Sequence, residues 1–161
     1  MAITARITIC NSYRDLDLRA ELDKHLTMLR RTGVIEFRRD KSSGRDEYRG
    51  CFETVIESAD VILLLVSPDF LASDYCYEFQ ARRALEQHQR KRASVIPVIL
   101  RPCDWGVTSF AELPAAPADG RPVTTWRNRD EAFMSVVRII RNALSSPGRQ
   151  PFTGPQDAGP C

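Results

Sequence analysis

Arginine side chains follow the first two predicted strands of this sequence. Arg14 comes shortly after a strand at residues 6–10, and Arg39 and Asp40 follow a short strand at residues 34–37. If these strands are neighbours in a parallel sheet, their carboxyl ends meet at one edge. Guanidinium groups at such an edge could bind a phosphate or diphosphate bidentately. The alternative is that each arginine is a solvated loop charge, the usual state of a surface arginine.

A second chemical candidate is the carboxylate of Glu78, in a predicted helix over residues 74–89. The apolar stripe of this helix is formed by Tyr77, Ala81, Ala84, Leu85 and His88. Glu78 borders that stripe, whereas Glu86 falls nearly opposite it and is expected to face solvent. A carboxylate in the first turns of a helix beside a ligand cleft could stabilise or attack an oxocarbenium ion during glycosidic cleavage. The alternative is that Glu78 only favours the helix N-terminus through the helix dipole.

Other common chemistries lack their motifs. The loop at residues 11–14 (NSYR) contains no glycine, so it is not a dinucleotide-binding GxGxxG turn, and a P-loop is likewise absent. His25 and His88 lie in predicted helices away from any candidate nucleophile, which disfavours a catalytic triad. The five cysteines include no CxxC pair, so we expect no metal site and expect most of the thiols to pack as small apolar groups. Cys103, in a loop after a strand, is the candidate for thiol reactivity.

An alternation of strands and helices positions these groups. The apolar patterns predict strands at residues 6–10, 34–37, 60–66, 94–100 and 122–126. Helical spacing predicts helices at residues 18–29, 48–56, 74–89 and 133–144. We therefore expect a flavodoxin-like α/β fold, a three-layer sandwich whose five-stranded parallel sheet has the order 2-1-3-4-5 and carries helices on both faces. Ligands of such sheets bind beyond the carboxyl ends of the strands, near the switch point between the first and third.

Two residues refine this scheme. Gly33 stands where the first helix is expected to end. Pro97 lies inside the fourth predicted strand, which requires a sheet position that tolerates a missing N–H donor.

Length and composition indicate the class of protein. The 161 residues suit one domain at 1–145, followed at 146–161 by a Pro- and Gly-rich tail or linker that we expect to be disordered. If this tail is a linker, a sensor domain could lie beyond it. The net charge of +2 gives no basic excess for direct binding to nucleic acid. No apolar run is long enough to cross a membrane and the N-terminus has no signal pattern, so we expect a cytoplasmic protein.

Several segments resemble those of bacterial TIR (Toll/interleukin-receptor) domains. Residues 7–13 (ITICNSY) resemble the first-strand motif, which is usually written with a Ser-Tyr pair. Residues 57–60 (ESAD) and 67–76 (SPDFLASDYC) resemble the middle of these domains. Residues 95–105 (VIPVILRPCDW), residues 122–126 and the last helix continue the similarity, which covers nearly the whole predicted domain.

This resemblance implies a domain that assembles with other TIR domains. Many family members cleave NAD⁺ at the nicotinamide–ribose bond, and in bacteria this activity often serves antiphage defence. The resemblance implies that Glu78 is the catalytic carboxylate and that residues 38–45 form the BB loop, which borders the nucleotide site and takes part in assembly. NAD⁺ is the substrate, and no separate cofactor or metal is expected, because cationic nicotinamide is already a good leaving group. The residues expected to bind the substrate are Ser12, Tyr13, Arg14, Arg39, Asp40, Ser67 and Tyr75.

The sequence departs from the family pattern at two places. Close bacterial relatives often read Tyr-Cys-Tyr-Asp-x-Glu where residues 75–80 of this chain read YCYEFQ. If the family glutamate belongs at Gln80, its role would fall to Glu78, which lies two residues, or roughly 200°, away around an α-helix. The BB loop reads KSSGR at residues 41–45, without the usual Pro-Gly pair. A noncatalytic TIR scaffold is therefore the alternative function, and a module that binds a product of NAD⁺ without cleaving NAD⁺ is a third.

Overall fold

The computed structural model describes residues 4–37 and 55–145, and its centre is a parallel β-sheet. The described strands are β1 (Ala5–Cys10), β2 (Ile35–Phe37), β3 (Val61–Val66) and β4 (Ser94–Ile99). Their order in the sheet is β2-β1-β3-β4, and the register aligns Ile7 of β1 with Val61 of β3 and Val61 with Ser94 of β4. The predicted order of the first four strands is confirmed, so the switch point lies between β1 and β3.

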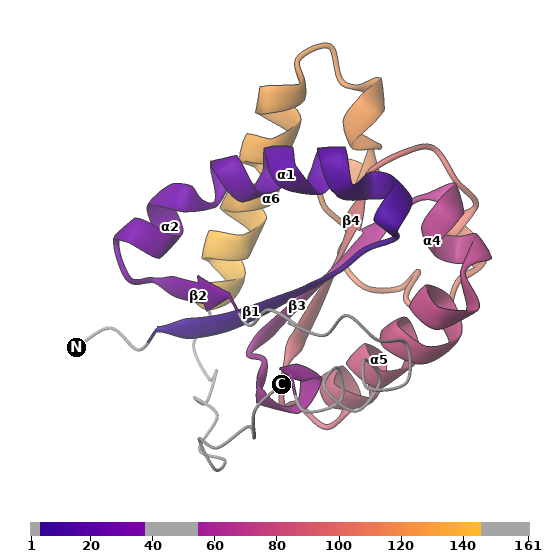
Figure 1. Ribbon diagram of the computed structural model, residues 1–161, viewed down its shortest axis with the longest axis horizontal. Helices are drawn as coiled ribbons and strands as arrows, with labels where there is room; N and C mark the ends of the chain where they lie inside the picture. Colours follow the sequence, from indigo (N-terminus) through magenta and orange to yellow (C-terminus); the bar gives the residue numbers. More distant parts are fainter. Residues whose placement is uncertain (1–3, 38–54, 146–161) are drawn as a thin grey trace.

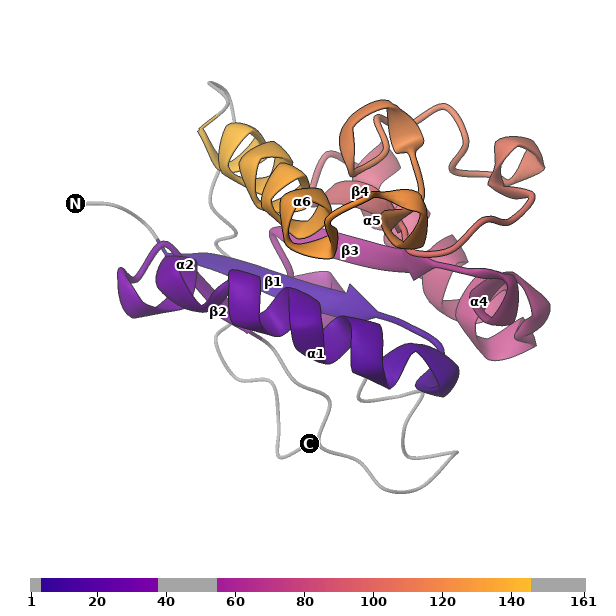
Figure 2. The ribbon, with the colours of Figure 1, turned by 90° about the horizontal axis from the view of Figure 1, so that it is seen from above.

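Helices cover both faces of the sheet, which gives the three layers of the predicted fold. One face carries α1 (Leu16–His25), α2 (Thr27–Arg31) and α6 (Arg129–Leu144). The opposite face carries α4 (Pro68–Ala72), the π-helix η2 (Tyr75–Ala81), α5 (Arg82–Gln89) and a helical turn at residues 55–58. Figure 1 shows α1 above the strands and α5 below them, and Figure 2 looks onto the face that α1 and α6 cover.

The two faces of β3 are buried in two separate cores. All six residues of β3 are buried, which explains why its sequence is a continuous apolar run without alternation. Its odd-numbered residues join a core with Ile7 and Phe133 beneath α1 and α6. Its even-numbered residues join a core with Phe70 and Ala84 beneath α4 and α5.

The chain passes from α1 through α2 to β2 with little interruption of the helix. The Leu26 N–H donates to the Leu22 carbonyl (3.0 Å) and the Arg30 N–H donates to the Leu26 carbonyl (3.2 Å), so helical hydrogen bonds bridge the boundary between α1 and α2. Gly33 then adopts a positive φ of 74°, and its N–H donates to the Arg30 carbonyl (3.0 Å). The predicted end of this helix at Gly33 is confirmed, because the left-handed conformation there favours glycine.

The prediction of a fifth strand at residues 122–126 is wrong. This segment forms the 3-10 helix η5 (Val123–Thr125), in which the N–H (2.9 Å) and Oγ1 (2.7 Å) of Thr125 both donate to the Pro122 carbonyl. Pro122 itself has no N–H to offer a sheet. The outer edge of β4 is covered instead by an isolated bridge at Ala116, and the Thr124 N–H donates to the Leu100 carbonyl (3.1 Å) just after the strand.

Other predictions fall on residues that the structure does not describe. These are the tail at 146–161, the BB loop at 38–45 and most of the second predicted helix. The division of the chain into a domain at 1–145 and a tail therefore stays a prediction. No helix within residues 4–37 and 55–145 has the length and apolar character needed to cross a membrane.

Pro97 lies in β4 where its missing donor breaks no bond to β3. Its carbonyl accepts from the Ala116 N–H (2.8 Å), and the Ile99 N–H donates to the Ala116 carbonyl (2.8 Å). The Leu100 N–H, in contrast, donates to Val66 of β3 (2.8 Å). Positions 97 and 99 thus direct their main-chain groups to the outer edge, and the residues that alternate with them, Val98 and Leu100, face β3. The sequence expectation that the sheet tolerates this proline is confirmed.

We expect Pro97→Val to change the free energy of unfolding by no more than about 1 kcal/mol, because no hydrogen bond to β3 depends on this residue. Val98→Pro should destabilise the domain by about 3 kcal/mol or more, because it removes an N–H directed at β3 from a buried strand. Chemical denaturation followed by circular dichroism measures both values. Equal losses of stability would contradict this assignment of the two edges of β4.

Candidate functional site

One buried carboxylate joins the carboxyl ends of β1, β3 and β4. Asp15, in the 3-10 helix η1 (Tyr13–Asp15) after β1, is only 2% exposed. Its oxygens accept hydrogen bonds from Ser67 Oγ (2.5 Å), directly after β3, and from Arg101 Nε (3.0 Å), after β4. Arg101 also pairs with Asp69 of α4. We call Asp15, Ser67, Asp69 and Arg101 the switch-point network.

The polar and charged groups of the switch-point network are one another's hydrogen-bond and ion-pair partners. Burial opposes the charge of Arg101, but the carboxylates of Asp69 and Asp15 outweigh burial and raise the pKa of Arg101 above its usual value. Ser67 is fully buried, and its oxygen also accepts from the Phe70 N–H (3.1 Å), which caps α4. Ser67 was expected to bind substrate, but in this structure its hydroxyl is out of reach of a ligand and serves to position the start of α4.

The loop after β1 exposes an aromatic ring and a guanidinium beside this network. Ser12 is 5% exposed and caps η1 by accepting from the Arg14 N–H (3.2 Å). Tyr13 is 72% exposed, and the Arg14 guanidinium lies over its ring, 5.1 Å from the centroid. Of the three residues in this loop that were expected to bind substrate, Tyr13 and Arg14 are accessible, whereas Ser12 shapes the turn.

The helix that carries Glu78 begins as a π-helix, η2, whose hydrogen bonds run from residue i to residue i+5. The buried positions of η2 and α5 are Cys76, Gln80, Ala81, Ala84 and Gln87. Tyr77, Leu85 and His88, which were expected in the apolar stripe, are only half-buried. The predicted stripe is therefore confirmed in part. Ala81 and Ala84 are buried, and Tyr77 and Leu85 pack against the same core, but the buried side of the helix also includes Cys76, Gln80 and Gln87.

Glu78 faces solvent, and Gln80 faces the core. Gln80 is 6% exposed, and its Oε1 has no hydrogen-bond partner in the described part of the chain. Tyr75 stacks on Phe79 beside Glu78, with 5.5 Å between the ring centroids. The expectation that Glu78 borders the buried stripe is corrected, because its side chain is exposed. Glu86, which was expected to face solvent, has a side chain that is 38% exposed and pairs with Arg83 of its own helix (3.3 Å).

The first turn of η2 lies against the end of β1. Cys76 Sγ donates to the Asn11 carbonyl at 3.8 Å, which places the helix of Glu78 beside the loop of Tyr13 and Arg14. Arg39 and Asp40, the remaining predicted binding residues, lie outside the described residues. The structure therefore places the helix that carries the exposed Glu78 beside the loop that exposes Tyr13 and Arg14.

Sequence reasoning missed Asp15 and Asp69 as members of this site. A weak signal exists for Asp15, because it stands three residues after Ser12 in the loop at the end of the first strand. For Asp69 the signal is its place in the first turn after the third strand, where an acid favours the helix N-terminus. Neither signal reveals the partner, because Ser67 and Arg101 lie 52 and 86 residues from Asp15.

The described thiols are not activated. Cys10 and Cys76 are buried and Cys103 is half-buried. Burial raises the pKa of each thiol above its usual value of 9.0, and for Cys103 the nearby Arg101 guanidinium opposes this effect without cancelling it. Within the described ranges, no group of three or more His, Cys, Asp or Glu side chains could hold a metal ion.

Replacing Asp15 by alanine should destabilise the domain by on the order of 3 kcal/mol, because Ser67 and Arg101 lose a buried charged partner. Asp15→Asn keeps an acceptor for the Ser67 hydroxyl and should destabilise the domain less than Asp15→Ala. The exposed neighbour Asp17 gives a matched control, and Asp17→Asn should stay within about 1 kcal/mol of the wild type. Thermal unfolding compares the three variants. A stable Asp15→Ala variant would show that the network does not hold the strand ends together.

Cys103 should react with iodoacetamide more slowly than free glutathione at about pH 7.5, because its raised pKa leaves little thiolate. The rate should increase as the pH rises beyond 9.0, the usual pKa of a thiol. Mass spectrometry of the alkylated peptide measures it. Labelling faster than glutathione at neutral pH would contradict the effect of burial.

Comparison with known proteins identifies the family. The model of a family described as the TIR domain matches residues 7–137. The protein y4lF of Sinorhizobium fredii, which is described as uncharacterized, is 48% identical over 134 residues. These residues are 82% of this chain and 41% of y4lF, so the chain spans less than half the length of this curated relative.

Two solved structures share the fold. The TIR domain of the Toll-related receptor TRR-2 from Hydra magnipapillata gives a TM-score of 0.57 at 22% identity, covering 86% of this chain and 100% of that one. A prokaryotic SEFIR domain gives a TM-score of 0.58 at 15% identity, covering 94% and 100% of the two chains. Identities this low show the fold alone. Together with the family match over residues 7–137, the architecture establishes that this chain belongs to the TIR domain family.

Proposed function

We propose that this TIR domain cleaves the nicotinamide–ribose bond of NAD⁺ when it assembles with other TIR domains, in bacterial immune or antiphage signalling. The proposal depends on the accessible carboxylate of Glu78, on the helix that lies against the end of β1. Two other acids at this edge, Asp15 and Asp69, are already paired with Arg101. Glu78 is therefore the carboxylate that we assign to the reaction.

The proposed reaction needs only a carboxylate and a surface that binds the substrate. Nicotinamide leaves with the electron pair of the broken bond and becomes neutral, while the ribose C1′ takes on oxocarbenium character. Glu78 stabilises that positive charge. Water then adds to C1′ and loses a proton to give ADP-ribose, or an adenine nitrogen adds to C1′ to give a cyclic product. Tyr13 offers a stacking surface, and Arg14 offers a bidentate group for the diphosphate.

We place the remaining substrate contacts on Tyr75, Arg39 and Asp40. Arg39 and Asp40 belong to the BB loop at residues 38–45, which we propose to order against a neighbouring TIR domain. In this scheme a sensor domain of a longer protein supplies the trigger, and the reaction takes place in the cytoplasm.

The burial of Gln80 favours a second candidate function, a noncatalytic TIR scaffold. Gln80 stands where close bacterial relatives often carry a glutamate, and it faces the core of the domain. In the scaffold the site has lost its acid, and the domain acts only by recruiting other TIR proteins. Glu78 then serves only as a surface charge near the start of its helix.

The two candidates differ in the release of nicotinamide by three variants. At high protein concentration with a crowding agent, the enzyme predicts release by the wild type and a loss of roughly a hundredfold or more in Glu78→Gln. Glu112→Gln, which alters an exposed glutamate in the loop after β4, is the matched control and should retain activity. Gln80→Glu should increase nicotinamide release little if the enzyme already uses Glu78. Chromatography of the products measures release and separates linear from cyclic ADP-ribose.

The scaffold predicts a different pattern. The wild type and Glu78→Gln release no nicotinamide although light scattering shows that they have assembled, and Gln80→Glu gains activity because it returns the missing acid. Activity that survives in Glu78→Gln would support an enzymatic function but reject Glu78 as its catalytic carboxylate. Glu86 and Glu53 would then be the next residues to replace.

A further inference from the structure

The helix α5 and the turn after it carry a concentrated positive charge. Residues 82–92 (RRALEQHQRKR) contain five cations and one acid, a net charge of +4 with histidine neutral, whereas the whole chain carries only +2. The rest of the sequence is therefore slightly acidic, and the small net charge of the chain conceals a basic surface. We call the exposed cations of this segment the α5 basic surface: Arg82, Arg83, Arg90, Lys91 and Arg92.

Four of these five cations form no ion pair with a described residue. Arg83 is the exception, because its Nη1 lies 3.3 Å from Glu86 Oε2 on the same helix. On α6, in contrast, the exposed Arg129 pairs with Glu21 of α1 at 3.4 Å and helps to hold the two helices together. The α5 basic surface thus carries charge that the described domain does not use for its own packing.

The turn after α5 holds three consecutive cations in place. The Lys91 N–H donates to the His88 carbonyl (3.0 Å). The Arg92 N–H donates to the Gln87 carbonyl (3.0 Å), and the two bonds together form a Schellman motif. His88 Nδ1 accepts from the Val95 N–H (3.2 Å), which ties the turn to the start of β4. The cations therefore project from a preorganised backbone, and little order has to be gained when a ligand binds.

Lys91 occupies a backbone position that suits glycine. Its φ is 58°, in the left-handed region. Gly33 stands at the matching position after α2, with a φ of 74° and the same pattern of hydrogen bonds. A side chain in this region has a conformational cost that glycine avoids. The stability of the turn therefore does not explain a lysine there, whereas a use for its charge does.

We propose that the α5 basic surface binds the phosphate backbone of duplex nucleic acid without reading its sequence. Guanidinium and ammonium groups donate to phosphate oxygens, and such contacts supply the non-specific affinity of proteins for nucleic acid. The eight residues of α5 extend for about 12 Å at a rise of about 1.5 Å per residue. Over that length one strand presents three or four phosphates, spaced by about 3.4 Å along the duplex axis, which is close to the number of unpaired cations.

The chemistry of this face favours a duplex over a membrane or a single strand. None of the exposed large apolar residues of the described structure lies on α5. They are Tyr13, Leu16, Met28, Val107 and Met134. Stable attachment to a membrane surface needs an inserted apolar group or a lipid beside the basic residues, and a single-strand site needs exposed aromatic rings for stacking. A duplex needs neither, because donors alone reach its phosphates.

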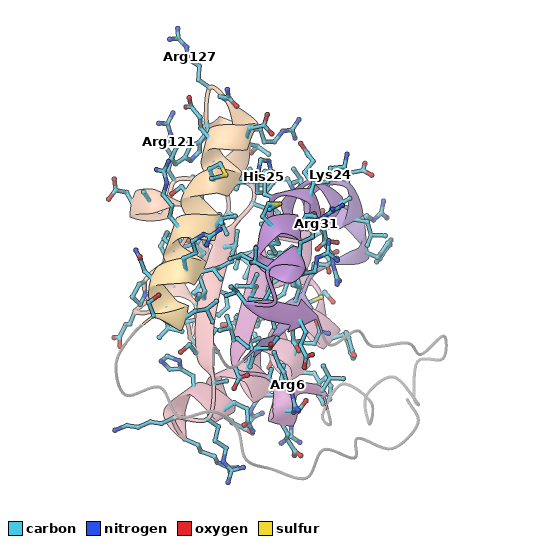
Figure 3. The ribbon with its side chains drawn as sticks, turned by 90° about the vertical axis from the view of Figure 1, so that its left-hand side faces the viewer. Arg6, Lys24, His25, Arg31, Arg121 and Arg127 are labelled. Carbon is cyan, nitrogen blue, oxygen red and sulfur yellow. The ribbon has the colours of Figure 1, made fainter. Side chains whose placement is uncertain are left out.

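The α5 basic surface is separate from the other exposed cations. It lies on the face of the sheet opposite α1, α2 and α6. Figure 3 shows Lys24 and Arg31 along α1 and α2, and Arg121 and Arg127 at another end of the molecule. Arg31 is exposed at the end of its own helix, so it provides a control for the loss of one helix-end charge. This inference goes beyond the proposed cleavage of NAD⁺, and it is tested without NAD⁺.

The salt dependence of duplex binding tests the proposal. Fluorescence anisotropy of short labelled DNA and RNA duplexes measures the affinity of the full chain over a range of salt concentrations. The wild type should bind with a dissociation constant of roughly 1–100 μM at physiological salt, and the logarithm of the affinity should fall with the logarithm of salt with a slope of about −4. The triple variant Arg90→Gln, Lys91→Gln, Arg92→Gln should lose about 3 from that slope and bind at least about tenfold more weakly, whereas Arg31→Gln should change the affinity less than about twofold.

Lys91→Gly separates the loss of charge from a loss of folding. It should reduce the salt slope by about 1 and yet raise the melting temperature by roughly 2–5 °C, because glycine suits the positive φ. A preference for DNA or for RNA would support the proposal and identify the duplex concerned.

Three results would overturn the proposal. The first is a wild-type chain that binds neither duplex at low salt. The second is an equal loss of affinity in Arg31→Gln and the triple variant, which would assign binding to overall charge. The third is tighter binding to single strands or to phosphatidylglycerol vesicles than to either duplex, which would assign the surface to those partners instead.

Discussion

The buried carboxylate of Asp15 is the constraint on which the functional end of this domain depends. Three parallel strands end beside one another there, and each is followed by a polar residue that needs a partner at the edge of the core. Asp15 supplies that partner to Ser67 and Arg101 at once, and Ser67 in turn caps α4. The positions of the loop after β1, of α4 and of the helix that follows α4 are all fixed relative to this carboxylate.

The parts of the fold that the sequence predicted well depend on local patterns. β3 was recognised because burial on both faces requires an apolar run, and the end of α2 was recognised because glycine accepts the positive φ found at Gly33. Residues 122–126 misled because their composition suits a strand, whereas Pro122 and the side chain of Thr125 favour a tight turn. The tight turn forms because Ala116 already pairs with the outer edge of β4, where a fifth strand would have to pair.

The candidate site was predictable only in part. The exposed Tyr13 and Arg14 were expected from their place after the first strand, and the structure leaves both accessible. Ser67 was also expected to bind substrate because it follows a strand. Its hydroxyl instead donates a hydrogen bond to Asp15, 52 positions earlier in the chain, and no local pattern reveals that partner. The orientation of Glu78 depends on the hydrogen-bond spacing of η2, and a helical periodicity read from the sequence assumes that spacing instead of revealing it.

The π-helical turn also bears on how this family could change over time. Beyond η2, Ala84 and Gln87 anchor α5 in the core, so the later part of the helix cannot rotate freely. Loss or gain of one residue within the wide turn can be absorbed by tightening it to an α-helical turn or widening it again, with the anchored part left in place. Such a single-codon insertion or deletion exchanges which side chain near Glu78 and Gln80 faces inward. An acid could enter or leave the site in one evolutionary step, without any substitution at the position itself.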